Sequence, residues 1–304
     1  MSILSYFTDA LLRGPTVGSM LMCATASLIG AIVYVRKQSL VGEALSHATY
    51  PGLILGVLLY SWLANENDDL LLSILIMIGA FFTALLGLYC VNILQRKLRI
   101  SGDAALCFVL SSFFGIGITL ASHVQFTHSM LYRKAQAYLY GQAATMSDIH
   151  IILYGSLLSI VLVAILVLYK EILTITFNRD YAKSVGMPVR KIDTLLFLLT
   201  TLAIVVGIRS VGVVLVSSML IAPPIAARQL THRFSTFLIL SLLIGLLSGF
   251  LGNYLSTELS QRFSAQELKT RFIFPTGPSI VLSAAFLCVF SLLYKVIRKR
   301  THQS

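Results

Sequence analysis

Long runs of apolar residues, separated by short polar or basic stretches, fill most of this chain. A membrane-spanning helix needs about 20 consecutive apolar residues, because the hydrocarbon core of a bilayer is about 30 Å thick. Runs of about this length recur along the 304 residues, and Lys and Arg collect at their ends. Charged residues make up 12% of the chain, against about 25% in soluble proteins. The sequence therefore predicts an all-α polytopic membrane protein.

The apolar runs predict about nine (eight to nine) transmembrane helices. The run before residue 228 is too long for one span and contains Arg209, so we expect two short spans there. One long tilted helix followed by a broken half-helix is the alternative. Residues 1–13 are expected to form a short interfacial helix. The predicted spans are residues 16–35, 42–63, 70–94, 103–122, 149–169, 194–208, 211–227, 235–256 and 278–297.

The distribution of basic residues predicts the orientation of the chain. Cytoplasmic loops of membrane proteins carry an excess of Lys and Arg. With the N-terminus outside and the C-terminus in the cytoplasm, sixteen of the 23 Lys and Arg lie on the cytoplasmic side. We expect outer loops at about 123–149 and 257–276, a cytoplasmic loop at about 171–192, and a single transmembrane domain over residues 1–304. The net charge of +11 then reflects membrane orientation, and no nucleic acid is expected as a partner.

One polar motif stands inside an apolar span and is the candidate functional site. Residues 42–52 read GEALSHATYPG, with Glu43 and His47 four residues apart. On a helix this spacing puts both side chains on one face, where a carboxylate and an imidazole can bind a divalent metal. Ionisable residues inside a membrane are costly and are usually functional. Pro51 and Gly52 are expected to loosen the helix at the same depth.

A structural role for the same pair is open on local grounds. Glu43 could lie at the water boundary, where the helix dipole favours a carboxylate near the start of a helix. His47 could form a hydrogen bond with a neighbouring helix. Both roles stay open until the rest of the chain is considered.

Other motifs restrict the possible activities. The chain has no G-x-x-x-x-G-K-[ST] loop for nucleotide phosphates and no H-E-x-x-H metalloprotease motif, so no enzymatic activity is expected. Acidic residues deep inside the spans are almost absent, which argues against a proton-driven transporter. Residues 177–188 are amphipathic and are stopped by Gly186 and Pro188. This segment is either an ordinary solvated connector or a docking helix for a cytoplasmic partner.

Three stretches, in this order and spacing, resemble the permease subunit of ATP-binding-cassette importers for manganese, zinc and iron. They are residues 42–52, residues 180–188 and residues 210–228, the last of which reads SVGVVLVSSMLIAPPIAAR. The resemblance covers about residues 14–297 and implies the fold of type II importers. It also implies cytoplasmic ATP-binding subunits, a second permease subunit (the same or a sister chain), an extracytoplasmic metal-binding protein, and a bacterial cytoplasmic (inner) membrane.

The resemblance also assigns roles to single residues. It implies that Glu43 and His47 are ligands along the metal path, although the family more often has Asp at the first position. The transported divalent metal (Mn, Zn or Fe) is the cargo, and no permanently bound cofactor is expected. The other assigned positions are Ser46, Pro51, Met219 and Pro223 along the translocation path and Asp180, Ala182 and Gly186 in ATPase coupling.

Two rival functions stay open beside this one. The first is a permease of similar architecture for a metal chelate or a vitamin, which would need a wide, neutral path. The Glu43 and His47 pair argues against such a path. The second is a non-transporting membrane scaffold or a membrane-embedded enzyme, and metal uptake would not depend on such a protein.

Overall fold

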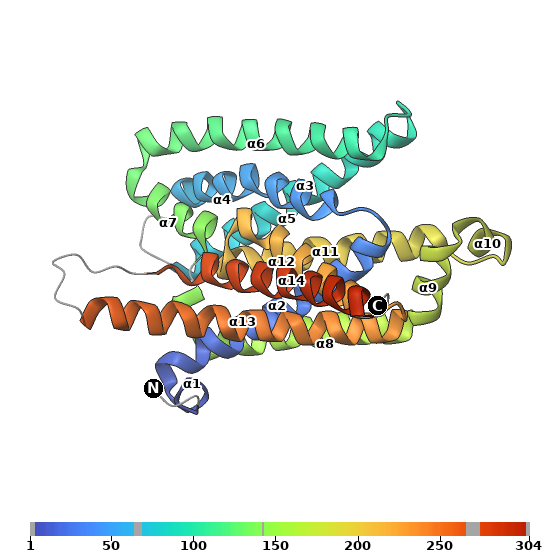
Figure 1. Cartoon of the computed structure of the whole chain (residues 1–304). Helices are drawn as coiled ribbons and strands as arrows, with labels where there is room; N and C mark the ends of the chain where they lie inside the picture. The colour runs from blue at the N-terminus through green and yellow to red at the C-terminus, as the bar shows by residue number, and fades with distance from the viewer. Residues whose placement is uncertain (1–3, 64–68, 142, 266–273, 302–304) are drawn as a thin grey trace. The chain divides into compact units, whose positions relative to one another are not determined.

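The computed structural model describes residues 4–63, 69–141, 143–265 and 274–301, which are almost entirely α-helical (Figure 1). The described helices group into two compact units. Unit 1 consists of Met1–Gln38, Gln142–Ala203 and Ser218–Ser304, and unit 2 of Ser39–Gly141 and Ile204–Ser217. The single permease domain expected from the sequence stays a prediction.

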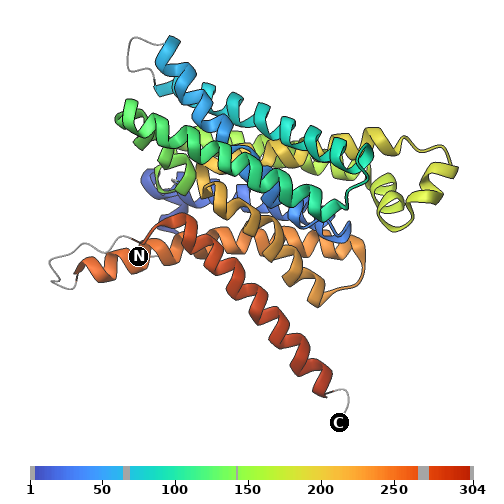
Figure 2. The same cartoon turned by 90° about the horizontal axis from the view of Figure 1, so that it is seen from above.

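Unit 1 is built around α2, which packs along α13 and α8. α13 also packs along α14, and Figure 2 shows α14 diverging from α13 toward its C-terminal end. The helices that lie wholly in this unit are α1 (Ser5–Thr8), α2 (Ala10–Val35), the 3-10 turn η1 (Ala143–Thr145), α8 (Asp148–Val167), α9 (Tyr169–Phe177), α10 (Arg179–Ser184), α13 (Phe234–Ala265) and α14 (Thr276–Thr301).

Unit 2 is built around the helix pair α3 and α4. α4 packs along α5 and α6, and α3 packs along the same two helices. The helices that lie wholly in this unit are α3 (Leu40–Ala48), α4 (Tyr50–Leu63), α5 (Asp69–Arg96), α6 (Gly102–Thr127) and α7 (Ser129–Tyr140). Two further helices, α11 (Val189–Val211) and α12 (Val213–Leu230), each contribute residues to both units.

Close backbone approach and buried hydrogen bonds hold α2 in the centre of unit 1. A Cβ atom added at Gly30 would overlap the backbone carbonyl of Leu220 on α12. The Asn253 side-chain amide on α13 donates to the Thr16 hydroxyl on α2 over 2.6 Å, and both residues are buried. Small residues and interhelical hydrogen bonds are the contacts expected in a membrane, where lipid removes the hydrophobic drive for helix association.

The predicted spans agree with the helices. Among the described residues, seven helices are long and apolar enough to cross a membrane: α2, α5, α6, α8, α11, α13 and α14. The two other predicted spans correspond to the α3–α4 pair and to α12. Several helices extend past their predicted ends, and α13 continues to Ala265 instead of ending at residue 256. The predicted boundaries followed the apolar stretch, whereas the helix continues into polar sequence.

Two local predictions are wrong. The interfacial helix expected over residues 1–13 is limited to α1, because the Asp9 side chain accepts a hydrogen bond from the Leu11 amide and caps a new helix at this point. The turn expected over residues 209–212 is narrower, since α11 continues through Val211 and the break falls at Gly212, with φ of 94°. The reading of this region as two helices is nevertheless confirmed.

The two expected outer loops are largely helical where they are described. Residues 123–149 contain the end of α6, α7, η1 and the start of α8. Within 257–276, residues 257–265 continue α13, and residues 266–273 lie outside the described part of the chain.

The contact at Gly30 predicts a position-specific loss of stability. Gly30→Val should destabilise unit 1 by about 1–3 kcal/mol, the usual cost of overpacking a filled interior. Gly115→Val is the matched control, because a Cβ at Gly115 on α6 meets nothing within 4 Å. The midpoint of thermal unfolding in detergent, followed by size-exclusion chromatography, measures both. Equal midpoints for the two variants would contradict the packing described here.

Candidate metal site

Residues 42–52 include the break between α3 and α4, which falls at Thr49. Pro51 has no amide hydrogen to donate to the carbonyl of His47, four residues earlier, so regular helix bonding is interrupted. Thr49 lies between the two helices, and its hydroxyl donates to the Ser46 carbonyl over 2.5 Å. The Thr49 hydroxyl thus bonds to the carbonyl of Ser46, one residue before the His47 carbonyl that Pro51 leaves without an amide donor.

Glu43 and His47 lie on α3, and both residues are half-buried. The helix extends from Leu40 to Ala48, so their four-residue spacing puts the two side chains on one face, as predicted. The His47 ring packs edge-on against Phe114 of α6, with centroids 4.7 Å apart and an interplanar angle of 80°. Its Nδ1 atom is buried and has no hydrogen-bond partner among the described residues. An imidazole nitrogen without a hydrogen bond can serve as a metal ligand when it carries the lone pair and the ion can reach it.

The other motif residues are packed inside unit 2. Ser46 is buried, and its hydroxyl donates to the Gly42 carbonyl over 2.7 Å. Pro51 is also buried. A Cβ atom added at Gly52 would overlap the Gly79 carbonyl of α5. Gly52 therefore permits close contact between α4 and α5, while the break itself follows from the missing amide of Pro51.

Met219 and Pro223, the other predicted path residues, lie one turn apart on the part of α12 that belongs to unit 1. Both are buried. The Met219 Sδ atom lies 3.5 Å from the Sγ atom of Cys23 on α2. The predicted path residues therefore form two groups, one in each unit.

The predicted docking segment contains a short helix, α10, with a well-defined end. Gly186 has φ of 78°, its amide donates to the Lys183 carbonyl over 3.0 Å, and the Met187 amide donates to the Ala182 carbonyl over 3.0 Å. These two bonds form a Schellman motif, which ends a helix at a glycine. Ala182 is fully buried, whereas the exposed Asp180 carboxylate pairs with Lys183 at 3.0 Å. The helix and its stop at Gly186 are confirmed.

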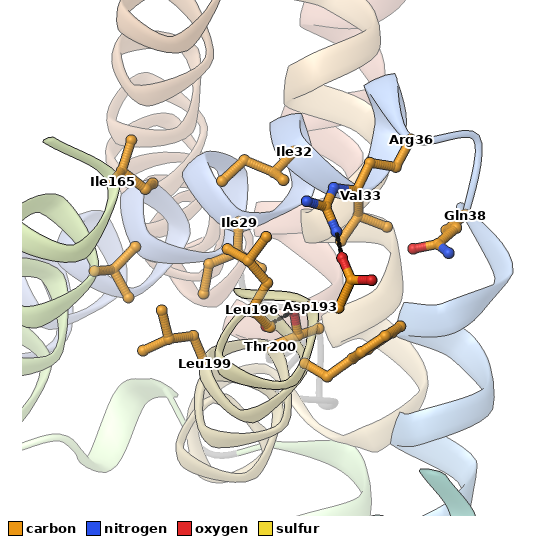
Figure 3. Close-up of a pocket in the computed structure, with 12 residues that line it drawn as sticks. Ile29, Ile32, Val33, Arg36, Gln38, Ile165, Asp193, Leu196, Leu199 and Thr200 are labelled. Atoms are coloured by element: carbon orange, nitrogen blue, oxygen red, sulfur yellow. Dashed lines mark hydrogen bonds and ion pairs between the residues drawn. The ribbon is translucent and has the colours of Figure 1, made fainter. Parts of the chain in front are cut away.

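A buried ion cluster was missed by sequence reasoning. The Nη1 atom of Arg36, at the end of α2, lies 2.8 Å from the Oδ1 atom of Asp193 on α11 (Figure 3). The other oxygen of Asp193 accepts from Arg179, the first residue of α10. Arg36 also donates from Nε to the Thr176 hydroxyl of α9 over 3.4 Å. We name Arg36, Thr176, Arg179 and Asp193 the Asp193 cluster.

Burial and charge act in opposite directions on this cluster. The side chains of Arg36 and Asp193 are only 11% and 12% exposed, and that of Arg179 is 53% exposed. Burial lowers the pKa of Arg36, and the charge of Asp193 opposes this shift. The only signal in the sequence was a basic residue and an acidic residue at the ends of two apolar runs, and many such residues are simply solvated.

The described residues of one chain supply an incomplete set of metal ligands. In the part of the chain that the structure describes, no group of three or more His, Cys, Asp and Glu side chains comes together. Glu43 and His47 offer one oxygen-type and one nitrogen-type ligand, whereas divalent transition metals in proteins usually have four or more ligands. A complete site would therefore need donors from outside these two residues.

The known proteins to which this chain is similar include membrane proteins of metal transport systems. The chain is 38% identical over 288 residues to the "Probable metal transport system membrane protein" of Chlamydia trachomatis, a match that covers 95% of this chain and 63% of that one. It is 33% identical over 276 residues to the manganese transport system membrane protein MntC of Bacillus subtilis, covering 91% and 59% of the two chains. The chain thus spans about three fifths of the length of these relatives.

A solved structure gives the same result for the fold. PsaBC from Streptococcus pneumoniae in complex with Fab matches with a TM-score of 0.76 and 25% identity, covering 95% of this chain and 94% of that chain. The predicted fold class, an all-helical polytopic protein of the type II importer permease kind, is confirmed.

The sequence profile described as the ABC 3 transport family matches residues 8–295. This match confirms the resemblance carried by the three sequence stretches. Because it extends over nearly the whole sequence, the chain belongs to the ABC 3 transport family.

Proposed function

We propose that this chain is the membrane permease subunit of an ATP-driven importer for a divalent transition metal, with manganese, zinc and iron as candidate cargo. The observation that carries the proposal is the Glu43 and His47 pair on α3, with the buried Nδ1 atom of His47 unpaired within the described residues. Family membership supports it, as do the names of the relatives, which are metal and manganese transport proteins.

The donor chemistry suits these metals. A carboxylate oxygen and an imidazole nitrogen are ligands for Mn(II), Fe(II) and Zn(II), whereas Cu(I) prefers thiolates and thioethers. The edge contact with Phe114 restricts the orientation of the His47 ring. Glu43 has one methylene more than Asp, which gives its carboxylate a longer reach from the same backbone position.

Two permease subunits would complete the site. If a second chain contributes an equivalent pair, two carboxylates and two imidazoles supply four ligands, which is enough to hold a divalent ion for a short time. Transport requires release as well as capture, so binding must be weak. The second permease is either another copy of this chain or a sister chain.

The chain depends on partners for energy and cargo. It has no nucleotide-binding loop, so separate cytoplasmic ATP-binding subunits hydrolyse ATP and dock on α10, near Asp180, Ala182 and Gly186. An extracytoplasmic metal-binding protein delivers the ion to the outer segments, residues 123–149 and 257–276. The chain crosses the bacterial inner membrane with its N-terminus outside and its C-terminus in the cytoplasm, as the Lys and Arg distribution indicates.

The ligand role predicts a loss of uptake without a loss of assembly. In cells that lack the chain but carry its partner ATPase and binding protein, the wild type should restore one cellular metal, whereas His47→Ala and Glu43→Ala should not. Elemental mass spectrometry of manganese, zinc and iron measures the result. His232→Ala is the matched control, because His232 is exposed between α12 and α13 and should behave as wild type.

Other outcomes point to the rival functions. If His47→Ala and Glu43→Ala no longer assemble with the ATPase, the pair has a structural role. If no transition metal changes on deletion of the chain, the metal proposal is wrong, and chelates and vitamins become the cargo to test.

The Schellman motif predicts that α10 tolerates only some residues at its end. Gly186→Val should impair docking, since a left-handed conformation costs a residue with a Cβ about 1–2 kcal/mol. Gly186→Asn should retain most docking, because Asn tolerates this conformation better. A Cβ at Gly186 meets nothing within 4 Å, so the effect is conformational. The amount of ATPase that copurifies with each variant measures docking, and equal retention by both variants would refute the prediction.

A further inference from the structure

The Asp193 cluster joins three helices of unit 1 through one carboxylate. Each oxygen of Asp193 bonds to a different arginine, Arg36 at the end of α2 and Arg179 at the start of α10. Arg36 also reaches Thr176 on α9. The carboxylate itself belongs to α11, in the second turn of that helix. The cluster therefore ties α9 and α10 to the adjoining ends of α2 and α11.

α9 and α10 have a second attachment, which is aromatic. The Phe234 ring at the start of α13 lies 5.8 Å from the Tyr169 ring and 6.3 Å from the Phe177 ring, both on α9. Figure 1 shows α9 and α10 beyond the end of α8. The aromatic rings hold α9, whereas the bond from Arg179 to Asp193 is the ion pair that reaches α10 itself.

We infer that Asp193 is the positioning residue that makes α10 move together with the ends of α2 and α11 during transport. The inference rests on the proposed function, in which α10 is the ATPase docking helix. Asp193 touches neither cargo nor nucleotide in this role. It acts through Arg179 on one side and through Arg36 on the other.

The physical reason is the cost of separating the charges. The Arg36 Nη2 atom is already buried and has no hydrogen-bond partner within the described residues. If the end of α2 moved away from α11, Arg36 would stay buried without its counter-charge, which is strongly unfavourable. If α10 moved away from α11, Arg179 would lose its charge-assisted bond to Asp193. Movement of the cluster as one body avoids both losses.

Figure 3 shows why water cannot easily replace the bond between Arg36 and Asp193. Arg36 and Asp193 face each other at the polar end of a small pocket whose other walls include the apolar side chains of Ile29, Ile32 and Leu196. Charge pairs in such surroundings are screened less by salt and water than exposed pairs are. The exposed pair of Asp180 and Lys183 on α10 lacks this protection.

The test measures movement and transport in the assembled complex of permease, ATPase and binding protein. Spin labels at Lys37→Cys and Val185→Cys, in a background without the native cysteines, report the distance between the end of α2 and α10 by pulsed electron resonance. Both positions are exposed. In the wild-type background the distance should stay the same with and without ATP. In Arg179→Gln and Asp193→Asn, addition of ATP should broaden the distribution of distances between the two labels or shift its mean.

Transport is read in the same complexes reconstituted in vesicles, with Mn(II) as the probe. Manganese transported per ATP hydrolysed should fall about tenfold in Arg179→Gln and Asp193→Asn, within the range typical of coupling between distant sites. Asp193→Glu should keep most of the ratio, because it retains the charge. Lys183→Gln is the control variant, because it also removes a positive charge from the surface of α10. It should transport more manganese per ATP hydrolysed than Arg179→Gln does.

Each other outcome is decisive. An ATP-dependent distance in the wild type, or wild-type distances and ratios in Arg179→Gln, would overturn the inference. Loss of assembly in Arg179→Gln, with Lys183→Gln assembled, would also overturn it, because the cluster would then serve folding alone. If the wild type transports no manganese while the distances behave as expected, manganese transport fails as the function and the role of Asp193 stands.

Discussion

Backbone amides and carbonyls inside a membrane must find partners within the protein, because no water is available to them in the hydrocarbon core. This requirement explains why the described chain is almost entirely helical. It also makes the helix breaks informative. At Thr49 the side-chain hydroxyl bonds to the Ser46 carbonyl, and at Gly212 the amide still reaches the Ile208 carbonyl over 2.9 Å. The candidate metal ligands stand directly before the first of these breaks.

Several polar contacts inside the units have an identifiable task. In unit 1 the bond between Asn253 and Thr16 joins two long helices, and the Asp193 cluster joins the ends of α2 and α11 to α9 and α10. In unit 2 the Ser46 and Thr49 hydroxyls serve the local backbone. His47 differs from Ser46 and Thr49, because its buried Nδ1 atom lacks a hydrogen bond within the described structure. Its position four residues from Glu43 on one helix supports a role in binding.

Local sequence was sufficient to predict the membrane spans, the helix face that Glu43 and His47 share, and the end of α10 at Gly186. Apolar length predicts a membrane helix, a four-residue spacing predicts a shared helix face, and glycine predicts a left-handed helix end. The split at Thr49 was only partly expected, since Pro51 was recognised as disturbing the helix but the position of the break was not. Helix ends were underestimated because polar residues continue a helix beyond the membrane, as α13 does to Ala265.

The Asp193 cluster could not be predicted, because its members are distant in sequence. Arg36 and Asp193 are 157 residues apart, and nothing in either local sequence specifies the other. The close contact between α4 and α5 was equally hidden, since a glycine in an apolar run has several explanations. Gly52 and Gly79 allow the two backbones to meet, so that an added Cβ at either glycine would overlap the carbonyl of the other.

That contact limits how the helix carrying the second half of the motif can move. Helices separated by a layer of side chains can shift against each other through rotamer changes, but touching backbones have no such layer between them. We therefore expect α4 and α5 to move together. Separation of these two helices is then not a route to the ligands on α3, where α6 also covers His47 through Phe114.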